Sequence, residues 1–68
     1  MDIKILVGKR VKKLRNKLGV SQEELADLAG LDRTYITSVE SGHRNISIVN
    51  IEKLANALKV TLKEFFDF

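Results

Sequence analysis

The sequence contains no cysteine, no proline and no tryptophan, and it has a single histidine, His43. Without cysteine the chain forms no disulfide, and one histidine alone does not make a structural zinc site. A chain of 68 residues buries a modest core, so stability must come from well-packed helices, from dimerisation or from both. The absence of proline and the presence of only four glycines favour a single all-α domain over residues 1–68.

Long hydrophobic runs are also missing from the sequence. No segment approaches the roughly 18 apolar residues of a membrane-spanning helix. The apolar stretch within residues 1–10 is too short for a secretory signal. We therefore expect a cytoplasmic protein with no membrane partner.

Side chains suited to catalysis are equally sparse. The carboxylates of Glu23, Glu24 and Asp27 lie on one predicted helix with no implied cleft. The chain is also too short to enclose a substrate pocket of ordinary size. We expect no enzymatic activity, no metal, no cofactor and no small-molecule ligand, and His43 is predicted to be a solvated loop residue.

Residues 21–42 are predicted to form two short helices joined by a tight turn. Ser21 and Glu24 have the spacing of a capping box, in which each side chain accepts a free backbone N–H of the first turn. Apolar residues at helical spacing then predict one buried stripe on a helix of about 8 or 9 residues. This stripe consists of Leu25, Leu28 and Ala29, with the small Ala26 beside it.

The second of these helices is predicted to begin after Asp32, which is a good N-cap residue. Gly30 ends the first helix, and Gly42 stops the second. Ile36 and Val39 form the inward pair of the second helix. Two helices joined by a short turn that contains glycine fit the description of a helix-turn-helix motif.

The outward face of the second helix has an unusual composition. It carries short hydroxyl side chains flanked by an arginine and a tyrosine, where surface helices usually carry Glu and Lys. Such side chains are able to enter a DNA groove and bond base edges. The alternative is an ordinary polar surface helix. The residues concerned are Arg33, Thr34, Tyr35, Thr37, Ser38 and Ser41.

A first helix is predicted from about residue 3 to residue 18. Its buried stripe consists of Val7, Val11, Leu14 and Leu18. Positive charge is concentrated here, because residues 1–20 hold seven basic residues and one acidic residue. This helix suits contact with DNA phosphates, for which we select Lys9 and Lys13. The alternative is a solvated lysine-rich surface.

Two further helices are predicted after the loop at residues 42–47. The longer begins at a Ser47 cap and ends near Leu58 or Lys59, with an apolar stripe of Ile48, Ile51, Leu54, Ala55 and Leu58. A second capping box, Thr61 with Glu64, opens a short helix that extends through Phe66.

Three of the four aromatic residues lie in the last four positions. A short terminal helix does not bury them all with equal ease, and an exposed apolar patch indicates an interface. We predict a dimer interface formed by Leu62, Phe65, Phe66 and Phe68, within a dimerisation region at about residues 47–68. The alternative is that these rings close the core of the monomer.

The chain resembles the Cro/CI-type (lambda-repressor-like, XRE) helix-turn-helix family. The resemblance is carried by Gln22, Ala26, Gly30, Ile36, Val39, the VESG run ending at Gly42, Arg44, Asn45, Ile51 and the LANALKV run. It covers nearly the whole chain. A narrower resemblance to restriction-modification controller proteins rests on RTY at residues 33–35 and on the GHRNIS loop.

This resemblance implies a compact five-helix lambda-repressor-like domain with the helix-turn-helix at its second and third helices. Gln22, Arg44 and Asn45 match residues that contact the DNA backbone in this family. Arg15 and Glu40 match a structural ion pair between the first helix and the recognition helix. The family further implies a prokaryotic or phage protein that dimerises and associates with the nucleoid.

The function implied is a sequence-specific regulator of transcription that binds double-stranded DNA. It would act as a homodimer on a near-palindromic operator, as an autoregulatory repressor or a restriction-modification controller. Arg33 is our first choice for base readout, supported by Thr34, Tyr35, Thr37 and Ser38. The alternative is a protein-interaction module of the same fold, such as an antitoxin or adaptor.

Overall fold

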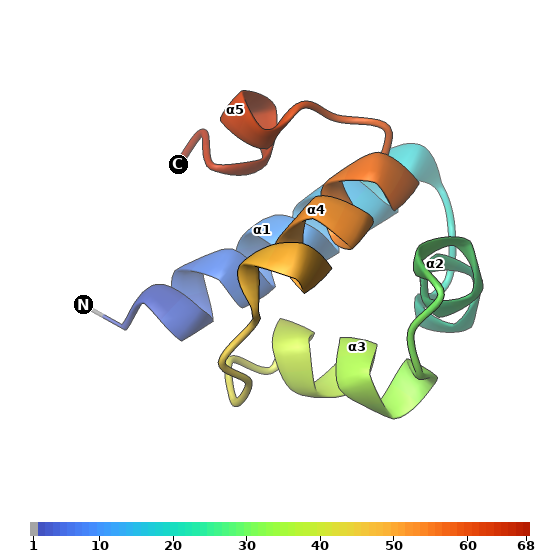
Figure 1. The fold of residues 1–68 in the computed structure, drawn as a ribbon, viewed down its shortest axis with the longest axis horizontal. Helices are drawn as coiled ribbons and strands as arrows, with labels where there is room; N and C mark the ends of the chain where they lie inside the picture. The colour runs from blue at the N-terminus through green and yellow to red at the C-terminus, as the bar shows by residue number, and fades with distance from the viewer. Residues whose placement is uncertain (1) are drawn as a thin grey trace.

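Five α-helices make up the computed structural model, which describes residues 2–68 (Figure 1). They are α1 (Ile3–Leu18), α2 (Gln22–Ala29), α3 (Arg33–Glu40), α4 (Ile48–Ala57) and α5 (Leu62–Phe65). No strand occurs in this part of the chain, so the all-α prediction is confirmed. None of the five helices is long and apolar enough to cross a bilayer.

Capping explains why the helix boundaries agree so closely with those predicted. Both capping boxes are present, at Ser21 with Glu24 and at Thr61 with Glu64. Gly30 ends α2 in the left-handed conformation, with φ of 68°. Asp32 is the N-cap of α3 by backbone geometry, but its side chain makes no capping hydrogen bond. The predicted extension of the last helix through Phe66 is wrong, because Phe66 is the C-cap residue.

The core lies between the helices and receives at least one large side chain from each of them. Its most deeply buried members are Val11, Leu25, Ile36, Val39, Leu54 and Phe65. Isolated helices shorter than about 12–15 residues are marginal in water, so α2 and α3, with eight residues each, depend on this packing. Burial of each large apolar side chain contributes about 1.5–3 kcal/mol.

Two residues predicted to lie on buried stripes are exposed instead. Leu28 faces solvent because α2 buries the side of the helix that carries Leu25, Ala26 and Ala29. The predicted stripe was therefore placed too far round the helix. Ile48 is exposed because it is the first residue of α4, where side chains point back toward the N-terminus.

Arg10 attaches α5 to α1. Its guanidinium donates hydrogen bonds to the carbonyl oxygens of Glu64, at 2.6 Å, and Phe65, at 3.3 Å. Those carbonyls belong to the last turn of α5, where a positive charge also complements the helix dipole. Figure 1 shows α5 and α3 at opposite sides of the molecule, with α1 and α4 between them.

Helices α1 and α3 approach each other closely at Gly8, which is buried. A Cβ atom on Gly8 would lie 3.1 Å from the carbonyl oxygen of Glu40 and closer still to that of Val39. Both are backbone atoms, so neither is able to rotate out of the way. The absence of a side chain at Gly8 therefore sets the distance between the two helices.

Gly8→Ala is expected to lower the free energy of unfolding by about 1–3 kcal/mol, because the added methyl group forces α1 away from α3. The same change in an exposed helix would stabilise it by about 1 kcal/mol, so the expected sign is opposite. Thermal unfolding followed by circular dichroism measures the effect. Asn16→Ala on the exposed side of α1 is the control and should leave stability unchanged or slightly higher. A melting temperature of Gly8→Ala at or above that of the parent would contradict the close approach.

Candidate nucleic-acid interface

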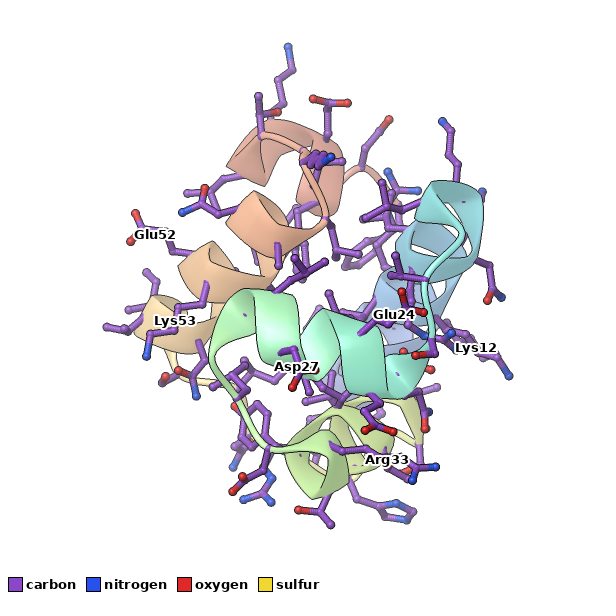
Figure 2. All side chains as sticks on the ribbon, turned by 90° about the vertical axis from the view of Figure 1, so that its right-hand side faces the viewer. Lys12, Glu24, Asp27, Arg33, Glu52 and Lys53 are labelled. Atoms are coloured by element: carbon purple, nitrogen blue, oxygen red, sulfur yellow. The ribbon has the colours of Figure 1, made fainter. Side chains whose placement is uncertain are left out.

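The outward face of α3 is polar and open to solvent. Arg33, Thr34 and Thr37 are exposed and Ser38 is half-buried, while Ile36 and Val39 are buried on the opposite side. Figure 2 shows Arg33 on α3, well separated from Glu52 and Lys53 on α4. The predicted division of α3 into an inward and an outward face is therefore confirmed.

A bidentate ion pair joins α1 to the C-terminal end of α3. Arg15 Nε lies 2.7 Å from Glu40 Oε2, and Arg15 Nη2 lies 3.0 Å from Glu40 Oε1. The two side chains are only 12% and 4% exposed. The hydrogen bond to Glu40 raises the pKa of Arg15 above its ordinary value, so the guanidinium stays charged. The predicted structural pair is confirmed, and it holds α3 against α1.

Gln22 connects α2 to the same carboxylate and to the outward face of α3. Its amide nitrogen donates to Glu40 Oε1 at 3.2 Å, and its amide oxygen accepts from the Thr37 hydroxyl at 3.1 Å. Gln22 thus has a role between helices that its sequence position did not indicate. The second amide N–H of Gln22 has no partner within residues 2–68 and is therefore available to a DNA phosphate. The contact between Gln22 and DNA stays a prediction.

Tyr35 anchors the loop that follows α3. Its ring is half-buried, its hydroxyl oxygen accepts a hydrogen bond from Asn50 Nδ2 at 3.1 Å, and the Arg44 guanidinium lies 4.7 Å from the ring centre. Cation–π contact of this kind contributes about 0.5–1 kcal/mol at an exposed site. Arg44 and Asn45 are exposed in the loop that follows α3, as contact with the DNA backbone requires. Asn50 was not predicted, because its partner is fifteen residues away in the chain.

The lysines of α1 divide between two sides of the helix. Lys13 lines a groove of about 600 Å³ together with Lys17, Lys59 and Glu64, on the side of α1 that faces α5. The DNA contact predicted for Lys13 is therefore dropped, since α3 lies against the other side of α1.

Lys12 lies on the side of α1 that contacts α3. It follows Gly8 by one helical turn and precedes Arg15 by three residues, and both of these residues contact α3. We select Lys12 in place of Lys13. Lys9 lies one helical turn before Lys13 on the same side of α1, so the DNA contact predicted for Lys9 is dropped as well.

The predicted interface residues near the C-terminus do not share one environment. Phe65 is 0% exposed and belongs to the monomer core, so its assignment to a dimer interface is wrong. Leu62, Phe66 and Phe68 are exposed, and the rings of Phe66 and Phe68 lie 6.2 Å apart. Phe66 also lines a small hollow of about 160 Å³ with Ile3, a residue that was not predicted to lie at an interface. We call Ile3, Leu62, Phe66 and Phe68 the apolar patch.

Comparisons with known proteins match this arrangement. The family model HTH_3, described as helix-turn-helix, matches residues 11–65. The control protein C.MunI from Mycoplasma sp is 52% identical over 66 residues, which cover 96% of this chain and 89% of the relative. The control protein C.BamHI from Bacillus amyloliquefaciens is 46% identical over 68 residues, 98% of this chain and 84% of the relative. The crystal structure of the restriction-modification controller protein C.AhdI from Aeromonas hydrophila superposes with a TM-score of 0.90 at 51% identity, covering 93% of this chain and 91% of that one.

Proposed function

The chain belongs to the helix-turn-helix family HTH_3 of DNA-binding transcription regulators, and from this we propose that it acts as a homodimer on a near-palindromic operator. The observation that supports this most strongly is the polar outer face of α3. The buried Arg15–Glu40 pair and the side chain of Gln22 hold that helix in a defined orientation. Arg33, Thr34 and Thr37 would read base edges, while Gln22, Arg44 and Lys12 would contact phosphates.

The regulatory role we propose is control of a restriction-modification system, including transcription from the protein's own promoter. C.MunI and C.BamHI are named control proteins, and each matches more than nine-tenths of this chain. Such a regulator would act on the nucleoid in the cytoplasm. It would act by binding DNA and would require no catalysis.

Dimerisation would use the apolar patch. Two copies joined there would present two α3 helices to successive major grooves on one face of DNA, about 34 Å apart. The patch lies at α5 and the start of α1, on elements separate from α3, so its burial would leave the reading face free.

Selection of bound sequences from a random duplex pool at about 150 mM salt tests the proposed function. We expect an inverted repeat with half-sites about one helical turn apart. Recovery of no motif, with binding that disappears as the salt concentration rises, would show electrostatic attraction alone. That outcome would favour the alternative of a protein-interaction module, either an antitoxin or an adaptor.

Arg33→Ala is expected to weaken binding to the selected operator by about 1–3 kcal/mol and to relax the preference at one base position. The guanidinium is exposed at the start of α3, where it is able to donate two hydrogen bonds to guanine. Competition binding against random DNA measures the effect. Lys53→Ala, which removes the same charge from the distant surface of α4, is the control. Equal losses on operator and random DNA would assign Arg33 to a phosphate.

Phe66→Ala is expected to raise the dissociation constant of the dimer about tenfold or more, because aromatic residues at the centre of an interface carry much of its energy. Sedimentation equilibrium measures this constant. Leu28→Ala removes an exposed apolar side chain outside the patch and should leave the constant unchanged. An unchanged constant for Phe66→Ala would exclude the apolar patch from the interface.

A further inference from the structure

The direction of each hydrogen bond around Gln22 follows from the chemistry of Glu40. A carboxylate accepts hydrogen bonds and has no proton to donate. The amide group within 3.2 Å of Glu40 Oε1 must therefore be the NH₂ end of Gln22, which places the amide oxygen on the opposite side. This arrangement settles the orientation of the Gln22 amide from its partner.

The amide oxygen of Gln22 in turn determines what Thr37 does with its hydroxyl proton. Thr37 Oγ1 lies 3.1 Å from Gln22 Oε1 and 3.1 Å from the carbonyl oxygen of Arg33. Both neighbours are acceptors, and a threonine hydroxyl has a single proton to share between them. The proton of Thr37 is therefore used within the protein, and only the lone pairs of its oxygen are available to DNA.

From this geometry we propose that Thr37 reads DNA as a hydrogen-bond acceptor only. The inference rests on the proposed function and adds the direction of one base contact to it. In the major groove, adenine and cytosine present amino donors, whereas guanine and thymine present carbonyl oxygens. A hydrogen-bond acceptor attracts the amino groups of adenine and cytosine and repels the carbonyl oxygens of guanine and thymine. Thr37 therefore selects adenine or cytosine on the strand that it faces.

The position of this contact is also constrained. Thr37 follows Arg33 by four residues on α3, or about 6 Å along the helix axis. Base pairs are spaced about 3.4 Å along the duplex. The adenine or cytosine should therefore lie within about two base pairs of the guanine that depends on Arg33.

Sequence selection with two variants of Thr37 tests the inference. The parent should prefer adenine or cytosine over guanine and thymine about threefold to tenfold at one position of each half-site. Thr37→Val has nearly the same shape but no oxygen, so this preference should disappear while the Arg33-dependent guanine remains. Thr37→Ser keeps the oxygen and should keep the preference. Thr34→Val removes the hydroxyl of another proposed base-reading residue, so any change that it causes should fall at a position other than the one that depends on Thr37.

A second measurement removes the donor from the DNA. The selected adenine is replaced by unsubstituted purine, or the selected cytosine by 2-pyrimidinone, so that the amino group is lost. The parent should lose about threefold to tenfold in affinity, and Thr37→Val should lose markedly less. Circular dichroism of each variant checks that the helices are intact.

The outcomes separate this inference from the function on which it rests. If the parent selects no motif, sequence-specific binding itself fails. If a motif is found and Thr37→Val leaves every position unchanged, Thr37 contacts no base and the inference fails alone. A preference for guanine or thymine at the position that depends on Thr37 would show that its hydroxyl donates, which also overturns the inference. The inference is also overturned if the parent and Thr37→Val lose the same affinity on DNA that lacks the amino group.

Discussion

Phe65→Ala is expected to lower the free energy of unfolding by about 3–5 kcal/mol and to leave most of the chain unfolded at room temperature. Phe65 is the largest fully buried side chain, and its removal leaves a cavity where α5 meets the rest of the core. A single core in a chain of this size supplies only about 3–5 kcal/mol in total. Urea or thermal unfolding followed by circular dichroism measures the loss, which corresponds to at least about 12 °C in melting temperature.

Phe66→Ala provides the matched control for this experiment. Phe66 is the next residue and has the same side chain, but it is 43% exposed and its ring stands edge-on to Phe65. Its loss should cost below about 1 kcal/mol at a protein concentration where the chain is monomeric. Similar losses for the two variants would show that the two rings share one environment, contrary to their burial.

Glu40→Ala is expected to cost about 3–5 kcal/mol, because it leaves the largely buried guanidinium of Arg15 without its counter-charge. Gln22 loses an acceptor in the same substitution, so the contact between α2 and α3 is weakened as well. The variant should therefore lose operator binding at temperatures where any folded fraction remains. Unfolding curves and operator titrations measure the two effects.

Two controls separate the buried pair from a general effect of charge. Glu52→Ala removes an exposed carboxylate on α4 and should change stability by less than about 0.5 kcal/mol. The double variant Arg15→Met with Glu40→Leu replaces both charges by apolar side chains and should recover much of the stability. A double variant as unstable as Glu40→Ala would mean that the lost shape, and not the unpaired charge, causes the destabilisation.

Helix boundaries were predictable because the signals that determine them are local. A capping box operates within four consecutive residues, and Ser21 with Glu24 or Thr61 with Glu64 forms it whatever the rest of the chain does. Gly30 ends α2 for a similar reason, since a left-handed conformation is easiest for glycine. The inward position of Ile36 and Val39 followed from helical periodicity alone.

Burial at the ends of elements was harder to predict because it depends on neighbours distant in sequence. Leu28 and Leu25 fit the same periodic stripe, yet the rotation of α2 against α3 and α4 exposes one and buries the other. Phe65 and Phe66 are adjacent and have the same side chain, so the sequence does not distinguish them. The docking of α5 through Arg10 places the first in the core and the second on the surface.

The sequence by itself determined that the chain forms five helices, that α3 carries a polar outer face, and that Arg15 pairs with Glu40. Tertiary structure alone decided that Lys12 rather than Lys13 lies on the side of α3, that Gln22 binds Glu40 and Thr37, and that Phe65 is buried. The first group rests on caps, periodicity and family resemblance, which are readable along the chain. The second depends on the angles and distances at which helices pack, and these are set jointly by side chains from all five helices.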